Sequence, residues 1–254
     1  MLIQGKYRVT RLLGQGSYSR VYEAVYDAKG TKVAIKFNLS QNEISTRLIE
    51  HEIEMYLLLK KRKAQNVISI KSFGICDSRH YLIMDLLPFT VVSYIQQYGN
   101  IDSICKQMHN IIQKLHEVNV MHRDIKPDNF MVSSQGNVYL IDMGLSSIYD
   151  RLDTRKLKRV IGSNMYCSFE CLQGSYIYRP RCDIVSLFYV IFDLIAPGSL
   201  PWNHVCVRNK EVKREILHLL KHHTDYEGYY THFHDPLLAQ WVQKYILYTT
   251  QVLF

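Results

Sequence analysis

Hydrophobic and polar residues alternate through the first third of the chain. In residues 7–37 the alternation recurs in three runs, with a glycine-containing turn at residues 14–17 between the first two. This pattern predicts three consecutive antiparallel strands. Residues 44–63 then carry apolar side chains at helical spacing. Two more strand-like runs follow, at residues 67–74 and 80–86.

The spacing of apolar residues becomes mostly helical after Leu87. Helices are expected at residues 91–98, 101–118, 183–195, 210–222 and 236–248. The chain is therefore predicted to have an α+β fold with two lobes, a small β-rich N-terminal lobe of about residues 1–86 and a larger, mainly helical lobe of about residues 89–254, with a hinge near residues 85–88.

Composition is that of a globular protein. Of the 254 residues, 47% are hydrophobic and 21% are charged, which excludes a disordered or fibrous chain. The six cysteines are scattered without a C-x-x-C pair, as is typical of a reducing compartment. A net charge of +8 is compatible with nucleic acid, an anionic membrane surface or acidic protein substrates, and does not choose between them.

The N-terminal segment and the most apolar segment both argue against export or membrane insertion. The sequence begins MLIQGKYRVTRLL, with charges where a signal peptide would be apolar. Residues 187–196 are apolar but short and include Asp193, so we expect a buried helix and no membrane span. We expect an intracellular protein of the cytoplasm or the nucleus, and a monomer.

Two short motifs lie in the strand-rich segment. Residues 14–19, GQGSYS, contain two glycines of a G-x-G-x-x-G pattern, with Ser19 in the third position. Because a strand follows this loop, it is typical of a loop that covers ATP phosphates, although a plain hairpin turn gives the same pattern. The run Val33-Ala34-Ile35-Lys36 places one lysine in an apolar strand, where it needs an anionic partner. Glu52 in the following helix is the preferred partner because it shares the apolar face, with Glu50 and Glu54 as alternatives.

The string at residues 122–129, HRDIKPDN, fits the pattern H-R-D-x-x-x-x-N. In this pattern Asp124 would accept a proton from a substrate hydroxyl, Asn129 would bind Mg²⁺, and Lys126 would provide positive charge for a transferring phosphoryl group. Asp142 follows a strand-like run and begins Asp-Met-Gly, a position at which a second Mg²⁺ ligand is expected.

In this order of motifs the chain resembles the eukaryotic protein kinase family. More narrowly it resembles the casein kinase 1 group, in EIEMY at residues 52–56, MDLL at 84–87, HRDIKPDNF at 122–130 and GSLPW at 198–202. The likeness covers about residues 7–203. It implies one bilobal kinase domain over residues 1–254 whose C-terminal end is shortened. It also implies Ser/Thr protein kinase activity with ATP and Mg²⁺.

The resemblance assigns further roles by position. Ser163 would bridge Asp124 and Lys126 through its hydroxyl, and Asp183 would hold the backbone of the HRD loop. Met84 would be the gatekeeper at the back of the ATP site. The remaining positions implied for ATP are Leu13, Gly14, Gln15, Gly16, Ser17, Tyr18, Ser19, Arg20, Val21, Ala34, Lys36, Asp85, Leu86, Leu87 and Met131.

Two positions depart from the family pattern. Ser19 replaces a glycine and Met143 replaces the phenylalanine of Asp-Phe-Gly, but neither change removes a charge or a metal ligand. Methionine can pack under the helix that carries Glu52. We therefore expect an active enzyme, with an ATP-binding pseudokinase scaffold and a nucleic-acid-binding module as the alternatives.

The segment between Leu145 and Ser168 is basic. Casein kinase 1 relatives prefer substrates with acidic or phosphorylated residues upstream of the target hydroxyl, and a basic cluster would provide the matching anion site. A solvated charged surface is the alternative. The residues expected in the cluster are Arg151, Arg155, Lys156, Lys158, Arg159, Arg179 and Arg181.

Overall fold

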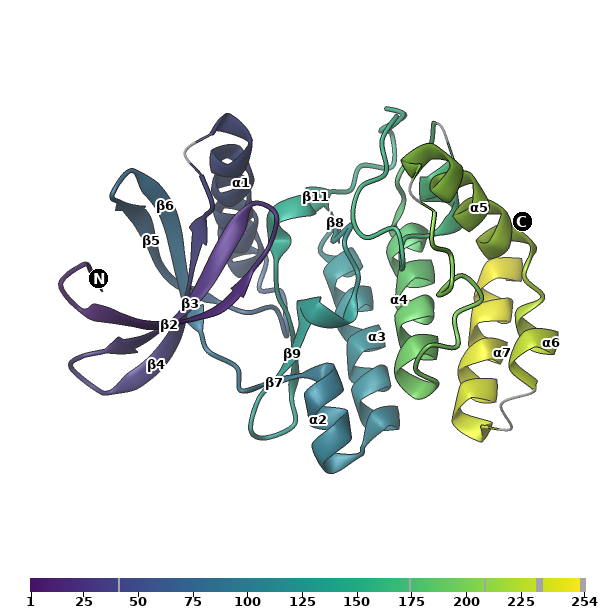
Figure 1. The fold of residues 1–254 in the computed structure, drawn as a ribbon, viewed down its shortest axis with the longest axis horizontal. Helices are drawn as coiled ribbons and strands as arrows, with labels where there is room; N and C mark the ends of the chain where they lie inside the picture. Colours follow the sequence, from purple (N-terminus) through teal and green to yellow (C-terminus); the bar gives the residue numbers. More distant parts are fainter. Residues whose placement is uncertain (41, 174, 208, 232–234, 252–254) are drawn as a thin grey trace.

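A six-stranded antiparallel sheet forms most of the N-terminal lobe of this computed structural model, which describes residues 1–40, 42–173, 175–207, 209–231 and 235–251 (Figure 1). The strand order is β1-β2-β3-β4-β6-β5. The strands are β1 (Leu2–Ile3), β2 (Tyr7–Gln15), β3 (Ser19–Tyr26), β4 (Thr31–Asn38), β5 (Ile70–Cys76) and β6 (Arg79–Asp85).

Strand β4 lies inside the sheet and is buried on both faces. Because successive side chains of a strand point to opposite faces, Val33, Ile35 and Phe37 join one apolar cluster while Ala34 joins the other. The latter cluster continues across the helix at residues 43–61 into the C-terminal lobe. Lys36 shares the face of Ala34, so the strand directs its ammonium group toward this helix.

Helix α1 (Glu43–Lys61) packs beside the sheet. It begins where the side chain of Asn42 accepts a hydrogen bond from the amide of Ser45, at 2.8 Å, which satisfies one free backbone donor of the first turn. Its buried face includes Ile49, Glu52 and Tyr56. A carboxylate on an otherwise apolar face requires a cationic partner.

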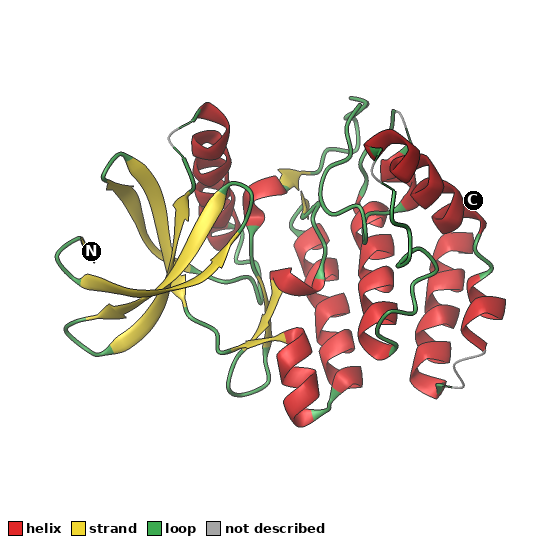
Figure 2. Ribbon diagram, viewed as in Figure 1, coloured by secondary structure: helices red, strands yellow, loops and turns green. Residues whose placement is uncertain are grey.

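The C-terminal lobe is built from helices that pack around α4 (Pro180–Ile195) (Figure 2). Residues 182–192 of α4 are all buried, so this helix is the centre of the lobe. Helices α3 and α7 pack against it. The other helices of the lobe are α2 (Val91–Tyr98), α3 (Ile101–Glu117), α5 (Lys210–His223), α6 (Tyr226–Thr231) and α7 (Pro236–Gln251).

Short strands and 3₁₀ turns between α3 and α4 carry the polar motifs. Strands β7, β9 and β10 form one small sheet, and β8 pairs with β11. These elements are β7 (Phe89–Thr90), β8 (Val120–Met121), η1 (Pro127–Asn129), β9 (Phe130–Val132), β10 (Val138–Leu140), η2 (Met143–Leu145), β11 (Ser147–Ile148) and η3 (Phe169–Leu172). These short elements lie on the side of the C-terminal lobe that faces the N-terminal sheet (Figure 1).

The predicted α+β architecture of two lobes is confirmed. The expected helices are present with ends that differ by a few residues, whereas α6 and the short strands β1, β7, β8, β9 and β11 were not predicted. The strand expected from residue 67 begins at Ile70, because Val67 instead makes an isolated bridge with Leu140. No helix in the described ranges is both long and apolar enough to cross a membrane.

Candidate active site

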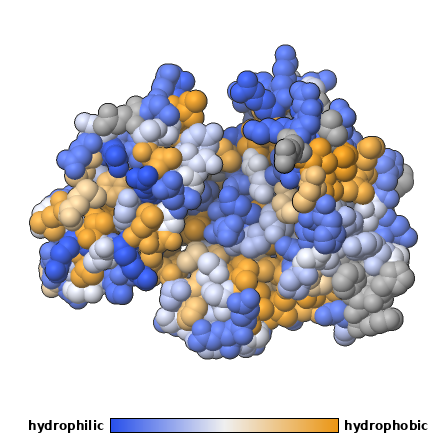
Figure 3. Space-filling view, viewed as in Figure 1, coloured by the Kyte–Doolittle hydropathy of each residue, from blue (hydrophilic) through white to orange (hydrophobic). Residues whose placement is uncertain are grey.

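A cavity of about 500 Å³ opens where the two lobes meet. The surface in Figure 3 is hollowed between the lobes. The cavity is lined by the turn between β2 and β3, by β4, by α1 and by loops of the C-terminal lobe. Its charged lining residues are Lys36, Glu52, Asp124, Lys126, Asp128 and Asp142.

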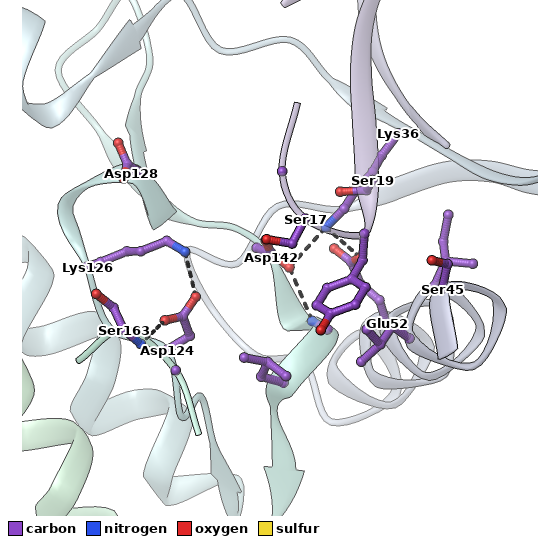
Figure 4. A pocket seen from close by; sticks show the side chains of 17 residues that line it. Ser17, Ser19, Lys36, Ser45, Glu52, Asp124, Lys126, Asp128, Asp142 and Ser163 are labelled. Carbon is purple, nitrogen blue, oxygen red and sulfur yellow. Dashed lines mark hydrogen bonds and ion pairs between the residues drawn. The ribbon is translucent and has the colours of Figure 1, made fainter. Parts of the chain in front are cut away.

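Lys36 joins two carboxylates from different elements (Figure 4). Its Nζ lies 2.7 Å from Oε2 of Glu52 on α1 and 2.9 Å from Oδ1 of Asp142. The two alternative partners lie elsewhere, since Glu50 approaches His80 at 3.5 Å and Glu54 is exposed. The sheet, α1 and the turn after β10 are therefore linked through one ammonium group.

Burial and the neighbouring charges set the protonation of Lys36, Glu52 and Asp142. Burial alone would lower the pKa of Lys36, but Glu52 and Asp142 raise it above its usual value. Burial raises the pKa of Glu52 to about 7, against the lowering effect of Lys36. Burial also opposes ionisation of Asp142, yet Lys36 lowers the pKa of that carboxyl to about 2. Lys36 and Asp142 are thus charged at neutral pH.

The turn that carries Asp142 is fixed from α1. Asp142 has a φ of 64°, and its amide donates to the hydroxyl of Tyr56 at 2.9 Å. Met143 is fully buried in the main core, and η2 packs against α1. The methionine expected to pack under this helix does so.

Asp124 is buried, and both of its carboxylate oxygens accept hydrogen bonds (Figure 4). The amide of Ser163 donates to Oδ1 at 2.9 Å, and Nζ of Lys126 donates to Oδ2 at 2.7 Å. The prediction for Ser163 needs correction, because its backbone amide and not its hydroxyl makes this contact. A direct bridge from Ser163 to Lys126 is not seen among the described contacts.

Asn129 lies beside Asp124. Its Nδ2 donates to the carbonyl oxygen of Asp124 at 2.7 Å, so Oδ1 is the side-chain oxygen that can bind a cation. The amide of Ile141 donates to the carbonyl oxygen of Asn129 at 2.9 Å. This bond places Asn129 beside the residue that precedes Asp142.

Asp183 on α4 holds the loop that precedes Asp124. It is fully buried and accepts hydrogen bonds from the amides of His122 and Arg123, at 2.8 and 2.9 Å. The hydroxyl of Tyr178 donates at 2.7 Å, and the ring of His116 approaches at 3.0 Å. Arg123 has a φ of 68°, so these bonds stabilise a strained backbone.

Only some of the predicted ATP residues line the cavity. Gly16, Ser17, Tyr18 and Ser19 line the cavity with Lys36. Strand β2 continues to Gln15, so the turn is shorter than predicted, and Gln15 accepts a hydrogen bond from Arg20 at 2.7 Å. The positions that do not line this cavity are Leu13, Gly14, Gln15, Arg20, Val21, Ala34, Met84, Asp85, Leu86, Leu87 and Met131.

The hinge positions border a different hollow. Ala34 and Met84 are buried and opposite each other in the pair of β4 and β6. Residues 85–87, however, line a separate cavity of about 360 Å³ together with residues 133–135. The structure therefore brings residues 16–19 and Lys36 together in one cavity, while residues 85–87 border another. The contact expected from residues 85–87 is made by their backbone groups and stays a prediction.

The predicted basic cluster is only partly assembled. Arg155, Lys156 and Arg179 line a cavity of about 800 Å³ below α1, together with Arg123. Arg155 is already paired with Asp153 at 2.6 Å. The remaining predicted members, Arg151, Lys158, Arg159 and Arg181, are not among the residues that line this cavity.

Arg181 is a correction to the predicted cluster. It pairs with Glu170 at 2.9 Å and lines another cavity, beside α5 and α7. Arg179 and Arg181 are close in sequence at the start of α4, but they point in different directions and line different cavities. Closeness in sequence therefore did not predict a shared site. Glu170 neutralises Arg181.

Sequence reasoning missed two residues that shape the site. No role was predicted for Tyr56, although its hydroxyl accepts a hydrogen bond from the amide of Asp142. Gly162 has a φ of 84°, and a Cβ there would lie 2.4 Å from the carbonyl oxygen of Arg123. An isolated glycine before a predicted site residue was the available signal for a tight backbone approach.

Comparisons with known proteins agree with this geometry. The family described as Protein kinase domain matches residues 7–241, so the chain belongs to the protein kinase family. It is 32% identical over 221 residues to a protein of Encephalitozoon cuniculi named probable cell division protein kinase, covering 84% of this chain and 82% of the relative.

A second relative is longer than this chain. A protein of Fusarium virguliforme named sucrose non-fermenting protein kinase 1 is 28% identical over 207 residues, or 78% of this chain and 29% of the relative. The similarity is therefore to one part of that protein.

Proposed function

We propose that this chain transfers the γ-phosphoryl group of ATP to Ser and Thr hydroxyls of proteins. The observation that carries the proposal is the pairing of Lys36 with both Glu52 and Asp142 in one cavity that also contains Asp124. In protein kinases the pair of lysine and helix glutamate must form for activity. Both named relatives are called protein kinases, which supports the same class.

The residues present fit Mg²⁺ and ATP. Asp142 and Asn129 offer a carboxylate and an amide oxygen, the hard ligands that Mg²⁺ prefers. The side chain of Asp142 is 40% exposed although Lys36 binds one of its oxygens. Asp142 and Asn129 would hold the ion, and Lys36 would orient the phosphates. When bound, Mg²⁺ neutralises negative charge on the phosphates.

Asp124 would act on the protein substrate. It would orient the Ser or Thr hydroxyl and accept its proton as that oxygen bonds to the γ-phosphorus and the bond from this phosphorus to the oxygen of ADP breaks. Lys126, which binds Asp124, would place positive charge beside the transferred group. The enzyme therefore contributes mainly by positioning and by electrostatic stabilisation.

We also propose a preference for acidic or phosphorylated substrates, and a place near the casein kinase 1 group. The support for the group is the sequence resemblance at residues 52–56 and 122–130. The support for the preference is the cavity lined by Lys156 and Arg179. Arg123 and Arg155 also line it, together with the three carboxylates Glu54, Asp150 and Asp153, and Asp153 is already paired with Arg155. Guanidinium and ammonium groups in one hollow are suited to bind a phosphate or carboxylate.

A peptide series tests both parts of the proposal. We expect transfer to Ser and Thr peptides and not to the matching Tyr peptide, with acidic or phosphorylated upstream residues lowering KM. Lys156→Ala with Arg179→Ala should abolish the acidic preference, and Lys60→Ala, an exposed lysine on α1, should not. Equal KM values for neutral and acidic peptides would contradict the proposed substrate preference. ATP binding without phosphate transfer would contradict the proposed activity and favour a scaffold.

A further inference from the structure

Helix α5 sends one lysine into the core of the C-terminal lobe. Lys221 is 1% exposed, and its Nζ donates hydrogen bonds to the carbonyl oxygens of Asn164, at 2.9 Å, and Cys167, at 2.6 Å. The same atom lies 5.2 Å from the ring centre of Tyr189 and 4.9 Å from that of Trp202. The ammonium group is thus enclosed by two carbonyl oxygens and two aromatic rings.

Burial of the Lys221 ammonium group costs free energy that an apolar side chain at the same position would not cost. Among the described residues no carboxylate forms an ion pair with Lys221. Burial lowers its pKa to about 8, which shows that the surroundings oppose the charge. An apolar side chain would occupy the position without that desolvation penalty. Its hydrogen bonds to the backbone are therefore the property that distinguishes lysine here.

The segment that Lys221 holds, residues 163–167, is fixed from several directions. Trp202 Nε1 donates to the carbonyl oxygen of Met165 at 2.9 Å. The hydroxyl of Tyr166 donates to Asp193 at 2.7 Å. Lys221, Trp202 and Asp193 of the C-terminal lobe thus each hydrogen-bond the segment.

The other end of this segment reaches the candidate catalytic carboxylate. The amide of Ser163 donates to Oδ1 of Asp124 at 2.9 Å. Ser163 lines the same cavity as Asp124, so a substrate hydroxyl that reaches Asp124 lies next to the start of this segment. The phosphate side of the cavity lies across from this segment, on β4 and α1.

We infer that Lys221 is a positioning residue for the protein substrate, which fixes residues 163–167 and, through the Ser163 amide, the carboxylate of Asp124. The inference rests on the proposed function. Loss of the two hydrogen bonds would let the segment move away from Asp124. The pairing of Lys36 with Glu52 and Asp142 would be unchanged, because in the described part of the chain none of the three shares a hydrogen bond or ion pair with residues 163–167.

Two variants of nearly equal size isolate the hydrogen bonds. Lys221→Met removes all donors, whereas Lys221→Gln keeps N–H groups without the charge. Lys213→Met is the matched control, with the same loss of charge on the same helix. The measurements are KM for a Ser peptide, KM for ATP, and hydrogen exchange at the amide of Ser163.

Lys221→Met should raise KM for the peptide about 10-fold and accelerate exchange at Ser163 by a similar factor, with KM for ATP unchanged. Lys221→Gln should retain most of the parent values, and Lys213→Met all of them. Equal effects of Met and Gln, or a Met variant that behaves as the parent, would overturn the inference.

Two further measurements keep the test decisive. If Lys221→Met does not fold, Trp202→Phe removes the donor to Met165 and keeps a ring, and an unchanged peptide KM in that variant overturns the inference. A parent chain without phosphate transfer would refute the proposed function instead. Exchange at Ser163 would still decide whether Lys221 holds the segment.

Discussion

The hydroxyl of Tyr56 accepts a hydrogen bond from the backbone amide of Asp142, at 2.9 Å. Tyr56 lies one helical turn after Glu52, so a single face of α1 contacts both Lys36 and the turn that carries Asp142. Movement of α1 would therefore displace the ammonium group and the proposed metal ligand together. The position of this helix determines whether the site is assembled.

Tyr56→Phe should weaken this link while keeping the ring in the core. The Asp142 amide would lose its acceptor, at a cost of about 1 kcal/mol in the free energy of unfolding, and phosphate transfer should fall. Urea denaturation and kcat measure both effects. Tyr98→Phe, at an exposed tyrosine, should change neither, and a Tyr56→Phe variant with parental kcat would show that the hydroxyl is dispensable.

Gly162→Ala should disrupt the approach of residues 162–163 to Asp124. The new Cβ would lie 2.4 Å from the carbonyl oxygen of Arg123, and the φ of 84° is unfavourable for alanine. We expect loss of most phosphate transfer and a lower Tm. Gly30→Ala, at a φ of 64° with no atom within 4 Å of the Cβ, provides the control for backbone strain alone. Equal losses in both variants would contradict the steric explanation.

Asp183 should stabilise the folded protein in a pH-dependent way. Burial alone would raise its pKa, but hydrogen bonds from His116 and Tyr178 lower it below the usual value of 3.8. A carboxyl with a lowered pKa in the folded state contributes stability above the unfolded value, and this contribution is lost as pH falls through the folded value. The folded state should thus lose stability below about pH 4.

Asp183→Asn tests that expectation. The variant should unfold about 3 kcal/mol more easily at neutral pH, because an amide N–H would face a backbone donor. The difference from the parent should shrink as pH falls below the usual pKa of 3.8, as measured by urea denaturation across the acid range. A difference that stays constant into acid would show that the charge of Asp183 does not matter.

The sequence predicted the parts of the site that local motifs define. Lys36, Asp124, Asn129 and Asp142 lie within or beside short patterns, and the helical face singled out Glu52 correctly. The strand and helix order followed from the spacing of apolar residues. These features depend on residues close in sequence, or on the burial of one face.

Features that depend on distant contacts could not be predicted in this way. Arg181 pairs with Glu170, and it does not line the cavity that its sequence neighbour Arg179 lines. Ser163 uses its backbone amide, which its side chain does not reveal. Lys221 lies on a helix with other basic residues, and only the packing of α5 shows that it is buried.

The most direct test of the proposed function is transfer of radiolabelled phosphate from Mg-ATP to casein by the parent chain and by Asp124→Asn. Asn keeps the size of Asp124 and lacks the base, so the parent should label casein and the variant should lose about 10²- to 10⁴-fold in rate. Equal labelling by both chains, or none by a folded parent that binds ATP, would contradict the account.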